Sequence, residues 1–384
     1  MKKLKELQTR EDLALYLAIP LQKLTYILYK SKPDSYYDTF EIPKKNGESR
    51  QIHAPSGDLK QLQKKLAQRL WDVYREFIEE NEIQDNISHA FQKGKSIITN
   101  ANIHRNKRYV LNLDLKDFFD HFHFGRVRGF FMKNKNFELP VEIATMIAQL
   151  TCYEGKLPQG APTSPIITNL VCNILDMRLL KIAKKYRVVY TRYADDMTFS
   201  TNDKKFLENQ ENFMKSIKKE IESFGFEIND KKTRLLFCDS RQEVTGLVVN
   251  KKISVNREYC KRTRAMADAF YRRGIFEICG EEGSVNQLEG RFSFINQIDC
   301  YNNKNDREQK HTFWTLNARE RQYQKFLFFK YFYANTKPLI VTEGKTDIVY
   351  LRAALKKYYK EYPELIKKQD DNFEFQVTFL RRSS

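Results

Sequence analysis

Two short runs rich in β-branched and aromatic residues flank a pair of adjacent acids near the middle of the chain. Residues 188–192 and 197–200 stand on either side of Tyr-Ala-Asp-Asp at 193–196. Runs of this composition around a short polar step predict a β-hairpin. Because neighbouring side chains of a straight strand point to opposite faces, two acids that share one ligand belong at the turn. Adjacent carboxylates repel each other, and a divalent cation relieves the repulsion. An acidic surface turn without a ligand is the alternative.

A third acid lies in an apolar, strand-like run upstream. Asp114 stands between Leu113 and Leu115, and a carboxylate in such surroundings is costly to bury without a cation or hydrogen-bond donors. Two oxygen-rich sites that converge on hard cations fit the two-metal scheme for phosphoryl transfer. The sequence therefore predicts Asp114, Asp195 and Asp196 as catalytic metal ligands for two Mg²⁺ ions, with Mn²⁺ as an alternative ion.

The remaining pattern predicts mainly helices around these strands. Residues 1–40 are expected to form short helices, and a capping box is expected at Thr9. Residues 40–56 predict two strands joined by an Asn-Gly turn at 46–47. Apolar residues at helical spacing predict longer helices over 58–80, 140–153, 164–186, 205–225 and 316–335.

Composition favours a polyanionic partner. The length of 384 residues predicts two or three domains. Lys and Arg number 67 against 49 Asp and Glu, and this net charge of +18 exceeds what solubility needs and favours phosphate contacts. The six Cys lack zinc-type spacing and are expected to be reduced thiols of a cytoplasmic protein. No apolar run is long enough to span a bilayer, so no membrane partner is expected.

Three motifs in order resemble those of reverse transcriptases. They are Asp-Leu-Lys-Asp-Phe-Phe at 114–119, Leu-Pro-Gln-Gly-Ala-Pro-Thr-Ser-Pro at 157–165 and Tyr-Ala-Asp-Asp at 193–196. The resemblance implies an α+β, right-hand polymerase with fingers, a palm with an antiparallel sheet, and a helical thumb. It implies RNA-directed DNA synthesis from deoxynucleoside triphosphates (dNTPs). A non-catalytic RNA-binding scaffold is the alternative, and the three intact acids argue against it.

The same resemblance implies a nucleotide pocket. Phe119 matches the aromatic side chain whose ring would clash with a 2′-hydroxyl, and Asp117 is expected to meet the triphosphate through its backbone. Gln159 and Gly160 match residues that pack on the incoming nucleotide and the template. A glycine allows the backbone to approach closely.

Basic residues are expected around the triphosphate. Lys232, with Lys231 as an alternative, resembles a lysine that lies near the pyrophosphate and serves as a general acid or charge partner. The predicted hairpin at 40–56 resembles the fingers hairpin that holds the triphosphate, and Lys44, Lys45 and Arg50 are its basic residues. A solvated basic hairpin is the alternative.

Two further motifs resemble signatures of retron reverse transcriptases. They are Asn-Ala-Asn-Ile-His at 100–104, which matches Asn-Ala-x-x-His, and the Val244-Thr245-Gly246 motif. Asn100 and His104 are four apart on one predicted helix, so they share a face and are expected to contact one RNA element. A histidine buried in the core is the alternative. RNA contacts are also expected from Val244, Thr245 and Gly246.

A place among the retrons implies a particular product. Such an enzyme copies a structured non-coding RNA from one of that RNA's own 2′-hydroxyls and makes branched RNA–DNA (msDNA). The resemblance also implies a role in antiphage defence, with self-association or an effector partner. A reverse transcriptase related to group II intron or abortive-infection enzymes is the alternative.

The expected domains are a helical cap (1–40), fingers and palm (41–250), a thumb (251–335) and a C-terminal segment (336–384). On the thumb, Lys261, Arg262 and Arg264 are expected to contact nucleic-acid phosphates.

The C-terminal segment resembles the start of a TOPRIM domain. Leu-Ile-Val-Thr-Glu-Gly at 339–344 passes from a predicted strand into an amphipathic helix, and Glu343 matches a glutamate that acts as general acid or base. The Asp-x-Asp that holds the metal of that family does not follow, because the only nearby acid pair is Asp370-Asp371. The segment is therefore expected to be an incomplete α/β unit, and nuclease activity is not predicted.

Overall fold

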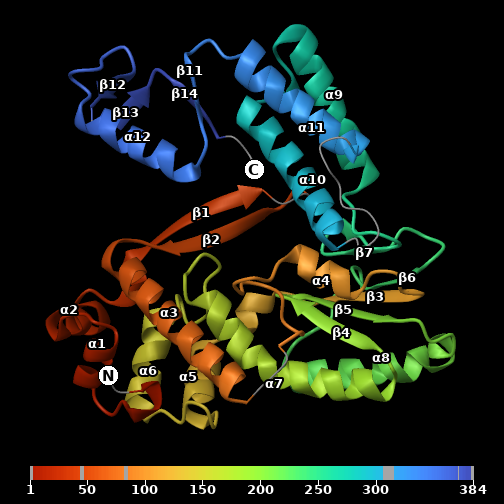
Figure 1. Ribbon diagram of the computed structural model, residues 1–384. Helices are drawn as coiled ribbons and strands as arrows, with labels where there is room; N and C mark the ends of the chain where they lie inside the picture. Colours follow the sequence, from red (N-terminus) through yellow and green to blue (C-terminus); the bar gives the residue numbers. More distant parts are fainter. Residues whose placement is uncertain (1–2, 44–46, 82–84, 306–314, 371, 382–384) are drawn as a thin grey trace. The chain divides into compact units, whose positions relative to one another are not determined.

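An antiparallel sheet carries the predicted acids. The computed structural model describes residues 3–43, 47–81, 85–305, 315–370 and 372–381. The sheet has the strand order β4 (Val189–Tyr193), β5 (Asp196–Thr201), β3 (Tyr109–Asp114), β6 (Arg234–Phe237), as Figure 1 shows. Both predicted strand runs, on either side of the acid pair and around Asp114, are confirmed. Nearly every residue of β3 is buried, which explains its continuous apolar run, because a strand covered on both faces does not alternate.

Helices cover both faces of this sheet. The helices α7 (Ser164–Lys185) and α8 (Phe206–Ser223) pack on one face, and the short helix α4 (Ile97–Ile103) packs on the other. Phe199 of β5 contacts Phe213 of α8, with 5.4 Å between ring centroids. The helices predicted over 164–186 and 205–225 are confirmed, and each end lies within two residues of its predicted position.

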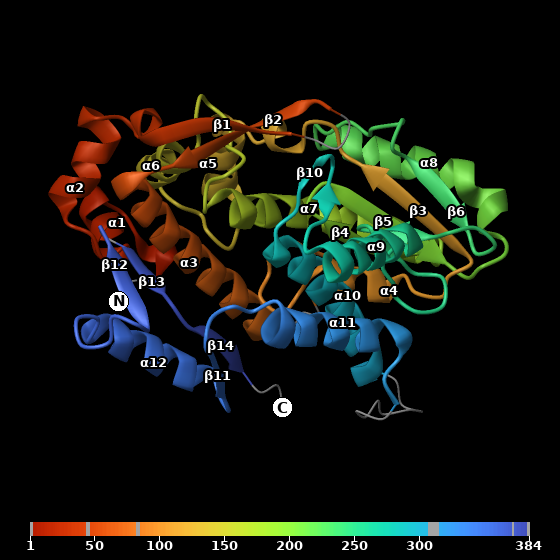
Figure 2. The ribbon, with the colours of Figure 1, turned by 90° about the horizontal axis from the view of Figure 1, so that it is seen from above.

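A helical layer and a hairpin precede the sheet in the chain. The long helix α3 (Gly57–Glu80) buries the leucine stripe that predicted it, and it packs against α6 (Val141–Thr151) and α7. The strands β1 (Tyr37–Pro43) and β2 (Ser49–Pro55) form an antiparallel hairpin, which is visible edge-on in Figure 2. Lys44 and Lys45, which follow Pro43 in the sequence, lie outside the described residues.

The shorter elements connect this framework. The helical turns of the N-terminal part are η1 (Leu4–Glu6), α1 (Arg10–Tyr16), α2 (Leu21–Thr25), η2 (Tyr26–Lys30) and η3 (Pro33–Tyr36). Thr9 caps α1 through the predicted capping box with Asp12. The remaining elements before residue 254 are η4 (Phe118–His121), α5 (Phe124–Lys133), β7 (Glu243–Val244) and β8 (Leu247–Val248).

The chain divides into two compact units, Met1–Ile253 and Ser254–Ser384. In the second unit, α9 (Arg257–Arg273), α10 (Val285–Asn305) and α11 (Ala318–Phe328) enclose an apolar core that includes Phe270 and Phe326. Its other elements are β9 (Glu277–Ile278), β10 (Glu281–Glu282), η6 (Phe329–Tyr333), β11 (Leu339–Thr342), α12 (Lys345–Lys357), β12 (Ile366–Gln369), β13 (Asn372–Phe375) and β14 (Thr378–Arg381).

The predicted strand and helix after residue 338 are both present. β11 pairs in parallel with β14, and α12 packs against these two strands. Glu343 is exposed between β11 and α12. Two parallel strands packed against one helix form a small α/β unit, as expected from the sequence.

Candidate active site

The hairpin β4–β5 brings the acid pair to one end of the sheet. Ala194 and Asp195 form the two-residue turn, and Asp196 is the first residue of β5. Ala194 has φ 57°, and a positive φ at only the first turn residue is the pattern of a type II′ turn. Glycine usually occupies this position, and a positive φ is sterically unfavourable for an alanine. The surroundings of Ala194 must therefore hold the turn.

The register of the sheet brings Asp114 to the same end. Asp114, the last residue of β3, pairs directly with Asp196. The next residue, Leu115, donates its backbone N–H to the carbonyl of Asp195 at 3.2 Å. Three carboxylates from two distant segments thus meet at one end of adjacent strands.

The electrostatics of these carboxylates show mutual repulsion. Burial raises the pKa of Asp196 to about 7, and Asp195 and Asp114 add to the shift. Burial also raises the pKa of Asp195, with a further contribution from Asp114. Both shifts mean that the ionised site needs positive charge, because the negative forms are poorly solvated and close together.

One positive charge comes from the segment after α8. Lys232 places its Nζ 2.9 and 3.0 Å from the two carboxylate oxygens of Asp114, and this contact raises the pKa of Lys232. Asn229 donates its side-chain amide to Asp114 at 3.3 Å and its backbone N–H to the Asp114 carbonyl at 2.8 Å. The family resemblance predicted Lys232 near the site, whereas Asn229 was missed.

The donor set has the chemistry of a hard-cation site. Carboxylate oxygens are the ligands that Mg²⁺ prefers, and the raised pKa values of Asp195 and Asp196 indicate that a cation would stabilise their ionised forms. Within the described residues, however, no group of three or more His, Cys, Asp or Glu side chains has the geometry of a metal site. The ammonium of Lys232 occupies both oxygens of Asp114.

The predicted nucleotide-pocket loop lies against the β1–β2 hairpin. The Gln159 carbonyl accepts a hydrogen bond from the backbone N–H of His53 at 2.9 Å. At Gly160, with φ +122°, a Cβ would lie 2.8 Å from a side-chain carbon of Ile52 and 2.9 Å from the His53 carbonyl. The close approach that requires glycine is therefore to β2 of this chain. The charge of Arg50, on the same strand, partly offsets the rise in the pKa of Asp195.

Phe119, the residue expected to exclude a 2′-hydroxyl, follows a strained turn. Asp117 has φ 42° and precedes η4, which sends Phe118 into the core, where it stacks on Phe226. Phe119 stays half-buried, with its ring 5.4 Å from that of Phe118. The turn at Asp117 therefore exposes part of the Phe119 ring while its neighbour is buried.

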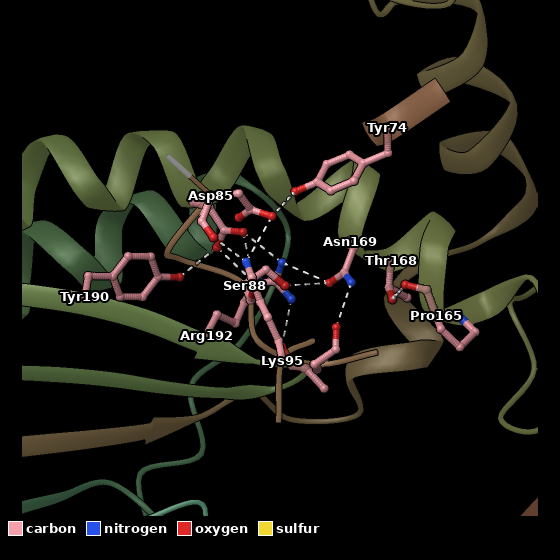
Figure 3. Close-up of polar contacts among 12 residues, drawn as sticks. Tyr74, Asp85, Ser88, Lys95, Pro165, Thr168, Asn169, Tyr190 and Arg192 are labelled. Atoms are coloured by element: carbon pink, nitrogen blue, oxygen red, sulfur yellow. Dashed lines mark hydrogen bonds and ion pairs between the residues drawn. The ribbon is translucent and has the colours of Figure 1, made fainter. Parts of the chain in front are cut away.

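A buried ion pair anchors the β4–β5 hairpin, the catalytic hairpin, to α7. Arg192 has no exposed surface, and its Nε and Nη2 donate to the two oxygens of Asp176 at 2.9 and 2.8 Å. The hydroxyl of Tyr190 donates to the same carboxylate at 2.8 Å. Arg192 Nη1 also donates to the carbonyl of Ala194 at 3.1 Å, so the guanidinium holds the strained turn directly. Figure 3 shows the side chains of Tyr190 and Arg192 pointing toward the same carboxylate.

The segment before α4 supports the same strand. The backbone N–H of Arg192 donates to the Ile87 carbonyl at 2.8 Å, and the Ser88 hydroxyl donates to Asn169 of α7 at 2.9 Å. Lys95 donates to the Ser88 carbonyl at 2.8 Å and pairs with Asp85 at 3.0 Å, as Figure 3 shows. Sequence reasoning missed this network. Its signal was a charged residue, Arg192, inside an apolar strand run, because a buried charge requires a partner.

The side chains of Asn100 and His104, which were expected to contact RNA, are buried instead. Asn100 is 1% exposed and His104 0% exposed, so neither side chain is available to RNA. The two residues lie on one face, as their spacing predicted, but that face packs against the central sheet. There His104 meets the Ser200 hydroxyl and Asn100 meets the Thr191 hydroxyl. The alternative of a buried histidine is the one the structure shows.

The second retron signature is a tight turn. Thr245 and Gly246 join β7 to β8 with φ 47° and 79°, the pattern of a type I′ turn. The side chain of Val244, which was also expected to contact RNA, is buried. Thr245 is half-buried and Gly246 is exposed. In the second unit, Lys261, Arg262 and Arg264 are all exposed on α9.

An antiparallel sheet that gathers three carboxylates from β3 and the β4–β5 turn defines the palm of a nucleic-acid polymerase. Residues 42–262 match the family model described as reverse transcriptase (RNA-dependent DNA polymerase). The chain therefore belongs to the reverse transcriptase family and is an RNA-directed DNA polymerase.

The curated relatives are reverse transcriptases of retrons. The chain is 33% identical to the retron Ec86 reverse transcriptase of Escherichia coli, over 75% of this chain and 84% of the relative. It is 32% identical to the retron Mx162 reverse transcriptase of Myxococcus xanthus, over 77% of this chain and 65% of the relative. A solved telomerase from Candida albicans aligns with a TM-score of 0.42 at 11% identity, over 85% of this chain and 64% of that one. None of the helices in the described ranges has the length and apolar character to cross a membrane.

Proposed function

We propose that this chain copies a structured non-coding RNA into msDNA, the branched RNA–DNA of a retron. The observation that carries the proposal is the pairing of Asp114 with Asp196, beside Asp195, in a chain whose relatives are retron enzymes. Its substrates are dNTPs, and synthesis begins from a 2′-hydroxyl of the RNA.

Asp114, Asp195 and Asp196 would hold two Mg²⁺ ions, with Mn²⁺ as the alternative. When bound, such ions activate the attacking hydroxyl and stabilise the leaving oxygen. Lys232 neutralises Asp114 in the ion-free protein and carries a proton that it can give to the departing pyrophosphate.

The pocket residues position the nucleotide. The charge of Arg50 partly offsets the rise in the pKa of Asp195, and its planar guanidinium suits the triphosphate. Lys44 and Lys45, close to Arg50 in the sequence, are proposed to bind it as well. The half-buried ring of Phe119 excludes the 2′-hydroxyl. The other residues proposed to line the pocket are Asp117, Gln159 and Gly160.

RNA binding is proposed for exposed residues. The turn at Thr245 and Gly246 and the basic residues Lys261, Arg262 and Arg264 are accessible in their own units, and the net charge of +18 supports phosphate contacts. The segment from 336 is proposed to be TOPRIM-like, with Glu343 at its first strand–helix junction, and to contact an effector or a second copy in antiphage defence.

Two experiments test the proposal. Primer extension on an RNA template with Asp195→Asn/Asp196→Asn should yield no DNA, and DNA synthesis by this variant would refute the assignment of the acids. Nucleic acid that co-purifies with the wild-type chain should contain one structured RNA joined to DNA through a 2′ linkage. An RNA without covalently attached DNA would favour a scaffold, and intron RNA would favour a maturase-like enzyme.

A further inference from the structure

The helix that carries the first retron signature faces the catalytic hairpin. Side chains of β4 alternate between the two faces of the sheet. Tyr190 and Arg192 point to α7, where both donate hydrogen bonds to the carboxylate of Asp176. Thr191, between them, points to α4, where its hydroxyl meets Asn100 and His104. The hairpin is therefore held by buried polar contacts on both faces.

The imidazole of His104 bridges the two strands of the hairpin. Its Nδ1 lies 2.7 Å from the Ser200 hydroxyl of β5, and its Nε2 lies 2.7 Å from the Thr191 hydroxyl of β4. All four partners in this cluster, Asn100 included, are at most 2% exposed. Burial lowers the pKa of His104 to about 3, so the ring is neutral and has one donor and one acceptor nitrogen.

The hydrogen-bond directions of this cluster follow from its chemistry. The Thr191 hydroxyl donates its single proton to the side-chain oxygen of Asn100 at 2.5 Å. It must therefore accept from His104, which assigns the ring proton to Nε2. Nδ1 is then the acceptor, and the Ser200 hydroxyl donates to it. Each of these three hydrogens, on Nε2 of His104 and on the hydroxyls of Thr191 and Ser200, has one acceptor. The three hydrogen bonds therefore have one consistent arrangement, which fixes the ring and both strands.

The two residues that His104 bridges lie close in sequence to Asp195 and Asp196. Thr191 precedes the strained Ala194 by three residues, and Ser200 follows Asp196 by four. A rotation of the hairpin away from α4 would break both contacts of His104 and leave buried hydroxyls unpaired, which is costly. The bridge therefore opposes the motion that would separate Asp195 and Asp196 from Asp114.

We propose that His104, supported by Asn100, is a positioning residue for DNA synthesis that locks the catalytic hairpin to α4 and makes no contact with RNA. The inference rests on the polymerase activity of the chain and is independent of which RNA it copies. The second signature adjoins the same helix, because the Thr245 hydroxyl donates to the Ile97 carbonyl at the start of α4 at 3.3 Å.

The test separates positioning from RNA recognition by using a substrate without retron RNA. Extension of oligo(dT) on poly(rA) is measured for wild type, His104→Asn, Thr191→Val and Ser200→Ala. A small displacement of reacting groups can lower turnover by about a hundredfold, and we expect kcat to fall at least about tenfold in His104→Asn. KM for the template–primer and the amount of RNA that co-purifies per mole of protein should stay within about twofold of wild type.

Thr191→Val and Ser200→Ala keep the shape of the core and each remove one partner of the ring, so they protect the test against misfolding of His104→Asn. We expect each to lower kcat in the same direction by a smaller factor. Gln63→Met is the matched control: Gln63 is also fully buried and donates to the Leu150 carbonyl at 2.7 Å, away from the hairpin. It should lower Tm without changing kcat at 25 °C.

Three results would overturn the inference. Wild-type extension of oligo(dT) by His104→Asn together with loss of co-purifying RNA would make His104 an RNA-recognition residue. Equal losses of kcat in Gln63→Met and His104→Asn at equal Tm would show that the loss of kcat reflects a general loss of stability and not the position of the hairpin. Unchanged kcat in all three hairpin variants would remove its role in positioning. Failure of the wild-type chain to extend oligo(dT) would instead contradict the polymerase activity itself.

Discussion

The ammonium of Lys232 lies 2.9 and 3.0 Å from the two carboxylate oxygens of Asp114. The lysine side chain is 62% exposed, whereas that of Asp114 is 11% exposed, so the contact joins an exposed cation to a largely buried anion. An ammonium and a divalent cation compete for the same oxygens because both are attracted to the same negative charge.

This competition makes a prediction about metal binding. In Lys232→Gln, Asp114 loses its cation, so Mn²⁺ should bind the protein more tightly than in wild type, while kcat should fall because the proton donor is lost. Mn²⁺ affinity is measured by electron paramagnetic resonance, and kcat by primer extension. Lys231→Gln is the matched control, with wild-type values expected. If Lys231→Gln lost activity and Lys232→Gln did not, the assignment of the two lysines would be reversed.

The ion pair of Arg192 and Asp176 predicts different effects on stability and on activity. Arg192→Met leaves a buried carboxylate without its cation, which should lower the free energy of unfolding by about 3–5 kcal/mol. In Arg192→Met/Asp176→Asn, most of that loss should be recovered, because no unpaired charge remains and Tyr190 keeps an acceptor. The Ala194 carbonyl still lacks its donor, so kcat should stay low. Urea unfolding and primer extension measure the two effects.

A recovery of kcat in step with stability in this double variant would mean that Arg192 does not hold the turn. A double variant as unstable as Arg192→Met would mean that the cost lies in packing and not in the unpaired charge.

The raised pKa of Asp196 predicts a dependence of stability on pH in the absence of metal. The pKa of an aspartate in the unfolded chain is near its ordinary value of 3.8, whereas burial raises the pKa of Asp196 to about 7 in the folded protein. Between these values the folded state binds a proton that the unfolded state has lost, so stability falls as pH rises through this window and changes no further above it. Thermal unfolding in EDTA at pH 5.5 and 7.5 tests this. The difference between the two pH values should be smaller in Asp196→Asn, and an equal difference in both proteins would contradict it.

The parts of the fold that were predictable are those determined by local pattern. Strand-like runs on both sides of Asp195 and Asp196, and the leucine spacing of α3, are set by residues a few positions apart. The alignment of Asp114 with Asp196 depends instead on the register of two strands more than eighty residues apart in sequence. No local pattern specifies that register, and only the family motifs indicated it.

The buried polar residues were interpreted wrongly or missed for a related reason. Asn100 and His104 have the same spacing whether their face meets RNA or protein, and the partners that decide the matter, Thr191 and Ser200, lie about ninety residues away. Polar side chains do not reveal from sequence alone which acceptor satisfies them. Burial is decided by packing of the whole unit.

Gly160 predicts a coupling between the pocket loop and the fingers hairpin. In Gly160→Ala, the added Cβ would meet Ile52 and the His53 carbonyl at 2.8 and 2.9 Å, so the loop must move away from β2. We expect a higher KM for dNTPs and a loss of stability of about 1–3 kcal/mol. Gly155→Ala is the control, since Gly155 also has a positive φ, of 78°, but no atom within 4 Å of the added Cβ. Its KM should match wild type, and an equal rise in both variants would make backbone strain the cause.

The half-buried ring of Phe119 predicts the sugar selectivity of the enzyme. Its edge contact with Phe118, 5.4 Å between centroids, and the fixed turn at Asp117 hold the ring in place. In Phe119→Ala, the space left by the ring should admit a 2′-hydroxyl, so kcat/KM for ribonucleotides should rise relative to that for dNTPs, while Phe119→Tyr should keep wild-type selectivity. Single-nucleotide incorporation with matched dNTP and ribonucleotide measures the ratio. A ratio unchanged in Phe119→Ala would show that another group discriminates the sugar, because removal of the ring is the largest change that this position allows.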